Sequence, residues 1–356
     1  MESKSKEVLV SMRGVKAYFP VRKGVFKRTV GHVKAVDNID LDIYRGEIIG
    51  LVGESGCGKT TLGKSLLQLV KPTAGSMEYA FKEGKRDLVK LSRKELDSAR
   101  KTLQIVFQDP YSSLNPAFTI FGSLEEPLRK FGVKKKADRE KIIGDLLVEV
   151  NMQREHMSRY PNEFSGGQRQ RIGIARALSV NPELIVCDEA VSALDVSIQA
   201  QVLQLLLRIK NELNLTYIFI THNLSVVEYI SDRIAVMYLG RIVELTDTDE
   251  LFSNTLHPYT KALLAAIPIA DLSRRKKRQP LQGDVPSPVN PPGGCPFHPR
   301  CPEVRAVCRK LVPQYRDYGR NGMEHFCSCH IVEERLGEGR PGGVGEAVPG
   351  RNEAAL

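Results

Sequence analysis

Two kinds of hydrophobic pattern alternate along most of the chain. Short, continuous apolar runs, typical of strands buried on both faces, occur at residues 48–52, 103–107, 184–187, 217–220 and 234–239. Segments with apolar residues at helical spacing lie between them, at residues 62–69, 138–151, 164–178 and 197–213. This alternation predicts an α/β fold, with a mainly parallel sheet that helices cover on both faces. In such sheets ligands bind beyond the carboxyl ends of the strands.

The N-terminal region predicts a smaller antiparallel element. Residues 8–19 predict a strand that ends at Pro20, and a basic, glycine-containing loop follows. Residues 39–43 then alternate with period two, as in a half-buried strand. Residues 73–100 are polar and mixed, and they predict a short antiparallel addition followed by a connecting helix. Residues 109–135 contain three prolines and predict turns and short helices.

A glycine-punctuated turn follows the apolar run at 48–52. Its spacing, Gly53-x4-Gly58-Lys59-Thr60, is that of a phosphate-binding loop. The glycines let the backbone curl so that N–H groups face phosphate oxygens, and the helix beginning near Lys59 directs its positive end at the same anion. We expect Lys59 to reach the β- and γ-phosphates of ATP and the Thr60 hydroxyl to ligate Mg²⁺. The other loop residues expected to contact ATP are Glu54, Ser55, Gly56, Cys57 and Thr61.

The alternative for this loop is a chance glycine-rich turn, and its position between a strand and a helix argues against that. Polar residues also follow the other buried strands. Asp188 is expected to hold Mg²⁺ together with Thr60, although a helix-capping role is the plain alternative. Glu189 is expected to polarise the attacking water. His222 would sense the γ-phosphate unless it is an ordinary surface histidine, and Gln108 would reach both Mg²⁺ and the water.

The centre of the chain carries a further motif, Phe164-Ser165-Gly166-Gly167-Gln168, at the start of a long helix. Together these motifs resemble those of ATPase subunits of ATP-binding cassette (ABC) transporters, and within that family the chain is similar to the ATPases of oligopeptide and dipeptide importers. The resemblance extends over residues 8–270. The family motifs are matched as follows: Walker A by residues 53–60, Walker B by 184–189, the Q-loop by Gln108, the signature by Ser165, Gly166, Gly167 and Gln168, the D-loop by 192–195 ending at Asp195, and the switch histidine by His222.

Two details of the match concern aromatic residues. Phe164 stands where leucine is usual before the signature. Phe19 aligns with the aromatic residue that stacks on adenine, and Tyr18 is the alternative, one residue away.

The resemblance implies an ABC-type nucleotide-binding domain over residues 1–270. Such a domain has a RecA-like core, a small antiparallel β subdomain and a helical subdomain, here at about 109–175. Two copies would meet head to tail, so that Ser165 and Gly167 of one cover the γ-phosphate held by Lys59 of the other. The implied partners are a second ATPase subunit, either a paralogous sibling or this chain itself, two transmembrane permease subunits and, indirectly, an extracytoplasmic substrate-binding protein.

The C-terminal region carries a different pattern. Residues 257–260, His-Pro-Tyr-Thr, resemble a tail motif of peptide-importer ATPases, and a basic, proline-rich linker follows at 271–292. Five of the seven cysteines lie within 295–329, in a segment at 293–335 that we expect to be a small metal module. Residues 336–356, rich in glycine and without periodicity, predict a disordered tail.

Many members of this subfamily carry a C-x5-C-x6-C…C array that binds a [4Fe–4S] cluster. The match implies four ligands: Cys295, Cys301, Cys308 and Cys329. Cys327 is the alternative fourth ligand, and a Cys₄ zinc site is the alternative metal centre, although zinc sites usually show C-x2–4-C pairs. Five unrelated buried thiols are the remaining interpretation, and the flanking prolines and glycines argue against it.

Composition limits the other functions only loosely. The 356 residues carry a formal charge of +10, which permits contact with a phospholipid surface or nucleic acid. No apolar stretch approaches the length of a membrane span, and the N-terminus lacks the apolar core of a secretory signal. We therefore expect a peripheral protein on the cytoplasmic side of the cell membrane.

Other functions remain as alternatives. A soluble ABC ATPase that acts on nucleic acid is disfavoured because the sequence has one signature copy and no interleaving of aromatic and basic residues. A regulatory protein that binds ATP without turnover is disfavoured because Glu189 and His222 are both present. The same motor could also serve an importer of oligosaccharides or of another solute.

Overall fold

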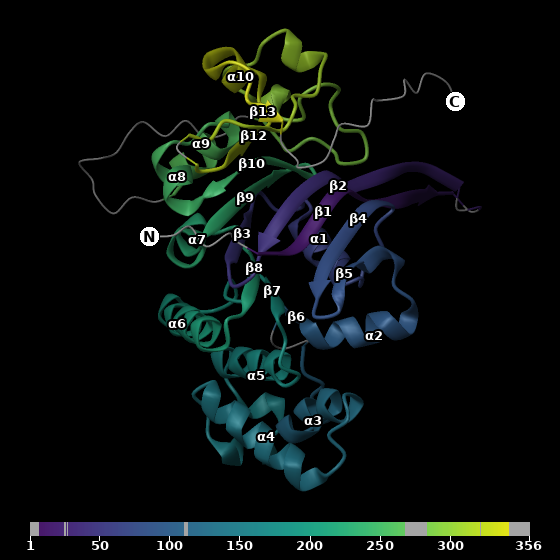
Figure 1. Ribbon diagram of the computed structural model, residues 1–356, viewed down its shortest axis with the longest axis vertical. Coiled ribbons are helices and arrows are strands. Elements are labelled where there is room, and N and C mark those ends of the chain that lie inside the picture. The colour runs from purple at the N-terminus through teal and green to yellow at the C-terminus, as the bar shows by residue number, and fades with distance from the viewer. Residues whose placement is uncertain are drawn as a thin grey trace.

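The computed structural model describes residues 7–341, except residues 25, 27, 110–112, 268–282 and 321. Figure 1 shows a central sheet with a helical arm at one end of the long axis and the C-terminal segment, residues 283–341, at the other. A long two-stranded hairpin projects from the side of the molecule, in the purple part of the ribbon.

Among the described residues, the larger sheet has nine strands. Their order is β13 (Arg340–Pro341), β11 (Arg316–Asp317), β12 (His325–Cys327), β10 (Arg241–Asp247), β9 (Arg233–Tyr238), β3 (Ile48–Val52), β8 (Thr216–Ile220), β7 (Leu184–Asp188) and β6 (Leu103–Val106). The half from β9 to β6 is parallel, whereas β10, β11, β12 and β13 pair antiparallel. The sheet is therefore mixed and not mainly parallel as predicted, because the C-terminal strands extend it. The strands β3, β7, β8 and β9 are buried along their whole length, as their continuous apolar runs predict.

The smaller sheet is antiparallel, which confirms the predicted β subdomain. Its order is β2 (Arg28–Tyr44), β1 (Val8–Lys23), β4 (Ala74–Phe81) and β5 (Gly84–Asp87). The prediction that the first strand ends at Pro20 was wrong, because β1 continues to Lys23. The strand β4 pairs with β1 only as far as Lys16, so Pro20 lies where β2 pairs with β1 on one side alone. A residue without an N–H is tolerated at such a position.

The helices cover the larger sheet and form the arm. They are α1 (Lys59–Leu66), α2 (Arg93–Thr102), α3 (Ile120–Lys130), α4 (Lys136–Glu149), α5 (Gly166–Leu178), α6 (Val196–Leu213), α7 (Leu224–Ile230), α8 (Thr248–Ser253), α9 (Pro258–Ala265) and α10 (His330–Leu336). Short 3₁₀ segments are η1 (Leu88–Lys90), η2 (Arg154–Ser158), η3 (Pro161–Glu163), η5 (His298–Arg300) and η6 (Val307–Arg309). The arm consists of α3, α4, η2 and α5, and α5 also packs against β6 and α6. The helix α5 thus joins the arm to the sheet.

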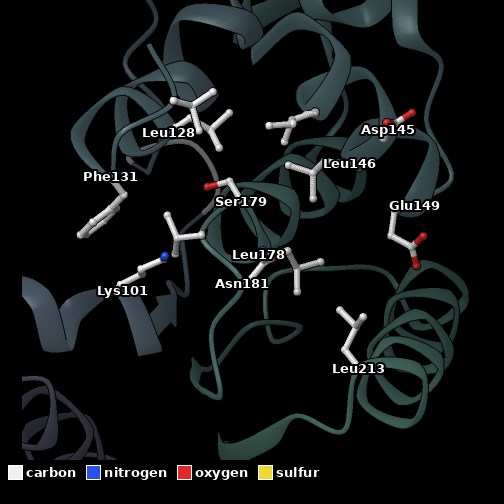
Figure 2. A pocket seen from close by; sticks show the side chains of 13 residues that line it. Lys101, Leu128, Phe131, Asp145, Leu146, Glu149, Leu178, Ser179, Asn181 and Leu213 are labelled. Carbon is white, nitrogen blue, oxygen red and sulfur yellow. The ribbon is translucent and has the colours of Figure 1, made fainter. Parts of the chain in front are cut away.

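A cavity of about 440 Å³ lies where the arm meets the core. Figure 2 shows Leu128 and Phe131 from the end of α3 on one side and Leu213 from the end of α6 on the other. Three of the lining residues each come just before a strand: Lys101 before β6, Asn181 before β7 and Leu213 before β8. The cavity therefore lies at the amino ends of these parallel strands, at the edge opposite to the one where α/β sheets bind ligands.

The C-terminal segment is packed against the core around the larger sheet. The strand β12 pairs with β10, and the ring of Phe297 contacts the rings of Tyr238, Tyr259 and His257. Nε2 of the buried His325 lies 2.9 Å from Oε1 of the buried Glu244. Residues 342–356 of the predicted tail lie outside the described residues. Within the described part of the tail, β13 pairs with β11. Of the linker predicted at 271–292, residues 271–282 also lie outside the described residues.

The buried His257 makes the stability of this fold depend on pH. Its Nδ1 accepts the N–H of Tyr259 at the start of α9, and burial lowers its pKa to about 4. The unfolded chain, with an ordinary histidine pKa of about 6.5, binds the proton more readily, so acid favours unfolding between these two values. When the pH is lowered from 7 to 5, this residue should reduce the free energy of unfolding by about 2 kcal/mol.

We expect His257→Asn, which keeps an N-terminal cap, to remove that part of the pH dependence in denaturant unfolding measured at pH 7 and pH 5. The matched control is His32→Asn, which removes an exposed imidazole. A pH dependence in His257→Asn equal to that of the unmodified protein would contradict the assignment.

Candidate nucleotide-binding site

The loop at residues 53–58 approaches other backbone segments so closely at its two ends that only glycine fits there. A Cβ on Gly53 would lie 2.2 Å from the carbonyl oxygen of Met237, and one on Gly58 would lie 1.9 Å from that of Ala35. Gly53, Gly56 and Gly58 have φ values of 148°, 78° and 109°, which favour glycine. The loop is thus held between β2 and β9, and Gly58 caps α1 with its backbone alone.

Lys59 and Thr60 begin α1 with their side chains turned back to the loop and the sheet. Lys59 is buried, and its Nζ donates to the carbonyl oxygens of Gly53 at 2.7 Å and Glu54 at 3.1 Å. Thr60 Oγ1 donates to Asp188 Oδ1 at 2.7 Å. Burial raises the pKa of Asp188, while the hydrogen bond from Thr60 and the charge of Lys64 oppose the shift. A hydroxyl and a buried carboxylate side by side are oxygen donors of the kind that Mg²⁺ prefers.

Glu189 is the point at which the predicted catalytic side chains meet. Gln108 Nε2 donates to Glu189 Oε2 at 2.8 Å, and His222 Nδ1 lies 3.4 Å from Glu189 Oε1. The backbone of Glu189 has a φ of 49°, a left-handed conformation that residues other than glycine rarely adopt. Its N–H donates to the carbonyl oxygen of Ile220, which fixes the turn directly after β7. Three side chains from three strand ends are therefore brought to one place.

The two candidate adenine-stacking residues have different surroundings. The hydroxyl of Tyr18 donates to Asp37 Oδ1 at 2.5 Å, and Lys34 Nζ lies 5.9 Å from the centre of its ring. Phe19 points to the other face of β1 and is 40% exposed. The exposed ring of Phe19 is the more accessible of the two to a nucleotide base.

The signature residues lie in the arm. Ser165 caps α5: its Oγ accepts the N–H of Gln168, and its own N–H donates to Gln168 Oε1 at 3.0 Å. A Cβ on Gly167 would lie 2.4 Å from Cγ2 of Ile198 on α6. The structure keeps the signature apart from the phosphate loop, because α5 packs against α3, α4, β6 and α6 whereas α1 packs against β1, β2, β7 and β8 (Figure 1). Asp195, from the predicted D-loop, is exposed at the start of α6.

Four of the five C-terminal cysteines interact with one another. Burial, with the nearby thiols Cys329 and Cys308 as a smaller cause, raises the pKa of Cys295 to about 12 and that of Cys301 to about 11. The fifth, Cys327, is fully buried and faces Glu244 and Cys329. Within the described part of the chain, no three His, Cys, Asp or Glu side chains form a group that could hold a metal ion.

One contact of the loop was not predicted from the sequence. Arg300, from η5, makes two hydrogen bonds to the carboxylate of Glu54, and Tyr259 Oη accepts the N–H of Glu54 at 2.9 Å. Arg300 is more than 240 positions from Glu54 in the sequence. Its position between two cysteines suggests a metal module and gives no signal of a nucleotide site.

Comparison with known proteins agrees with this geometry. A family model described as ABC transporter matches residues 36–192, and one described as the C-terminal region of oligopeptide/dipeptide transporters matches residues 243–308. The oligopeptide transport ATP-binding protein AppF of Bacillus subtilis is 48% identical over 93% of this chain and 99% of its own length. A probable peptide ABC transporter ATP-binding protein of Sinorhizobium fredii is 50% identical over 86% of each chain.

Solved structures are similar over the ATPase part. The ATP-binding cassette MJ0796, solved as a dimer bound to ADP and phosphate, superposes with a TM-score of 0.59 and 28% identity, covering 67% of this chain and 99% of that one. The cbiO1 subunit of the cbiONQ transporter from Clostridium perfringens has a TM-score of 0.57 and 25% identity, covering 70% and 92%. Over the described residues, the helices are all too short or too polar to cross a membrane.

The two glycines of α5 give a matched pair of substitutions. In Gly167→Ala the added methyl group meets Ile198, and we expect a loss of about 1–3 kcal/mol in the free energy of unfolding. In Gly173→Ala the methyl group meets open space, and replacing glycine inside a helix should add about 0.5–1 kcal/mol. Denaturant unfolding measures both, and the double substitution Gly167→Ala with Ile198→Ala should recover part of the loss. Equal effects at the two glycines would contradict the close packing of α5 on α6.

Proposed function

Because the chain belongs to the ATP-binding subunits of ABC transporters, in the family of oligopeptide and dipeptide importers, we propose that its phosphate loop and strand ends bind and hydrolyse MgATP to drive peptide uptake. The chain is the ATPase subunit of such an importer, coupled to peptide transport. The names of its relatives refer to peptides, which favours peptides over the oligosaccharide alternative and transport over a role on nucleic acid. The observation that carries the proposed mechanism is the meeting of Gln108 and His222 at Glu189, next to Asp188 and Thr60.

In this proposal the loop holds the triphosphate. The N–H groups of residues 53–61 surround the phosphates, and Lys59 exchanges its bonds to the loop carbonyls for bonds to the β- and γ-phosphates. Thr60 and Asp188 would hold Mg²⁺, and its charge would compensate the buried carboxylate. Phe19 stacks on the adenine.

Hydrolysis of the triphosphate depends mainly on placing the attacking water in line with the γ-phosphate and on neutralising the charge of the phosphate oxygens. Glu189 orients the attacking water and accepts its proton, because its carboxylate lies at the end of β7 next to the Mg²⁺ ligand Asp188. Gln108 positions the water and Mg²⁺, and His222 contacts the γ-phosphate. The hydrogen bond from Gln108 and the neighbouring His222 hold the carboxylate in place before the nucleotide arrives.

The site is completed by a second ATPase subunit. Ser165, Gly166, Gly167 and Gln168 lie on the arm, away from the loop of their own chain, so they face a triphosphate only across an interface. A serine hydroxyl and free N–H groups at the start of α5 suit a γ-phosphate. The exposed Asp195 and the adjacent Val196, which is 84% exposed, would lie in that interface.

Closure of the two ATPase subunits would reach the membrane through the arm. The cavity of Figure 2 lies between the arm and the core, and the arm joins the core along α5 and through the contact of Arg208 on α6 with Glu149 on α4. A rotation of the arm about this junction would move any permease subunit that rests on it. Binding to two permeases would keep the chain at the cytoplasmic side of the membrane.

For the C-terminal thiols we propose a four-iron cluster rather than zinc, because the segment lacks the C-x2–4-C pairs that are usual in zinc sites. A cluster spreads its four thiolate ligands over a larger body. Cys295, Cys301, Cys308 and Cys329 would hold it, with Cys327 outside the set because it lies within β12, where it pairs with Glu244 of β10. Its role would be to cross-link a segment with few regular elements.

The catalytic assignment is tested with Glu189→Gln. Without the carboxylate the water loses its proton acceptor, and we expect ATP turnover to fall by a factor of about 10²–10⁴ while ATP still closes the dimer. Phosphate release measures turnover, and size-exclusion chromatography with MgATP, alone and with a second ATPase subunit, detects the dimer. The control is Glu228→Gln, at an exposed position of α7. Turnover in Glu189→Gln near that of the unmodified protein would refute the assignment.

The metal assignment is tested with two alanine substitutions two positions apart. We expect anaerobically purified protein to contain about four iron and four acid-labile sulfide per chain. Cys329→Ala should lose most of both, because it removes a ligand, whereas Cys327→Ala should retain them. Metal and sulfide analysis with an absorption spectrum gives the readout. Stoichiometric zinc without sulfide, or equal loss in both variants, would overturn the assignment.

A further inference from the structure

The C-terminal segment contacts the phosphate loop through one buried side chain. Arg300 is only 6% exposed, and its Nη1 and Nη2 donate to Glu54 Oε2 at 2.6 Å and Oε1 at 3.0 Å. The guanidinium also lies 6.0 Å from the centre of the Tyr238 ring. A two-bond contact between the planar guanidinium and a carboxylate fixes both position and orientation, which lysine cannot reproduce.

Glu54 is held by three partners, and one of them is Lys59, the lysine proposed to bind phosphate. Its carbonyl oxygen accepts from Lys59 Nζ at 3.1 Å, its N–H donates to Tyr259, and its carboxylate is bound by Arg300. The residue therefore transmits the position of Arg300 to the loop that surrounds the triphosphate. The Arg300 charge also neutralises a carboxylate that would otherwise repel this anion.

The same segment reaches the other end of the loop. The N–H of Lys34 donates to the carbonyl oxygen of Pro288 at 3.1 Å, which adds residue 288 to the free edge of β2. Ala35 follows Lys34 in the chain, and its carbonyl group lies against Gly58. Residues 288 and 300 of one segment thus contact the structures that hold both ends of the phosphate loop.

We propose that Arg300 is a positioning residue for the nucleotide: through Glu54 it fixes and neutralises the start of the phosphate loop, so that the C-terminal segment is part of the ATP-binding unit. This inference rests on the proposed function, which places the triphosphate at Lys59. Because the contact acts on the loop before hydrolysis, its loss affects the binding of MgATP more than turnover at saturation.

The test compares MgATP affinity and steady-state kinetics in the full chain. In Arg300→Gln the unpaired carboxylate of Glu54 remains beside the triphosphate, and we expect the Kd and KM for MgATP to rise about tenfold with kcat within about threefold of the unmodified value. The Kd and KM of Arg300→Lys should lie between those of Arg300→Gln and those of the unmodified protein. The control is Arg309→Gln, which removes an exposed arginine of the same segment.

The double substitution Glu54→Gln with Arg300→Gln distinguishes neutralisation and positioning from general damage. It removes the unpaired carboxylate but does not restore the two-bond contact, and we expect the Kd for MgATP to recover part of the way toward that of the unmodified protein. A Kd in Arg300→Gln within twofold of that of Arg309→Gln, or a double variant as weak as Arg300→Gln, would overturn the inference. If Arg300→Gln does not fold, as judged by thermal melting, Arg300→Lys with and without Glu54→Gln serves as the same test.

The variant Lys59→Ala separates this inference from the proposed function. Loss of MgATP binding in Lys59→Ala together with no change in Arg300→Gln would refute the role of Arg300 alone. Undiminished MgATP binding in Lys59→Ala would refute the placement of the triphosphate itself.

Discussion

The register of the parallel strands determines where the chemistry of this protein lies. Val106 pairs with Cys187 across β6 and β7, and Asp188 pairs with Ile220 across β7 and β8. Gln108, Glu189 and His222 follow these strands by one or two residues, so a fixed register places all three at one edge. A shift of one residue in any of these strands would turn its side chains to the opposite face and remove one member from the group.

Most of the site could be predicted because its information is local. A buried apolar run followed by a polar residue specifies both a strand and the edge at which it ends, as at β7. A Cβ at Gly53 or Gly58 would lie within 2.2 Å of a backbone oxygen, so no other residue fits at either position. Such constraints appear in the sequence as spacing. The proposed roles of Asp188 and Glu189 rest on the same logic.

The parts that could not be predicted depend on pairing between distant segments. The sheet is mixed because β12 pairs with β10. The strand β12 has only three residues, which is too few to show a periodic hydrophobic pattern in the sequence. Pro20 lies inside β1 because β4 ends its pairing at Lys16, which the local sequence does not show. The contact of Arg300 with Glu54 is of the same kind. Within the arm, Phe164 is buried against the ring of His156, a contact that accommodates the larger side chain at a position where leucine was expected.

The two ends of the molecule differ in how they relate to the phosphate loop. The C-terminal segment is fixed to it by direct bonds and by the aromatic contacts of Phe297, so the segment and the loop move together. The arm meets the core away from the loop, along α5 and through contacts such as that of Arg208 on α6 with Glu149 on α4, and a cavity lies beside this junction. A motor of the proposed kind needs this asymmetry, because a rigid cradle must hold the nucleotide while a movable arm brings the signature of one subunit to the triphosphate of the other. The hydrogen bonds between Ser165 and Gln168 keep the start of α5 ordered before that contact is made, so closure orders few further side chains.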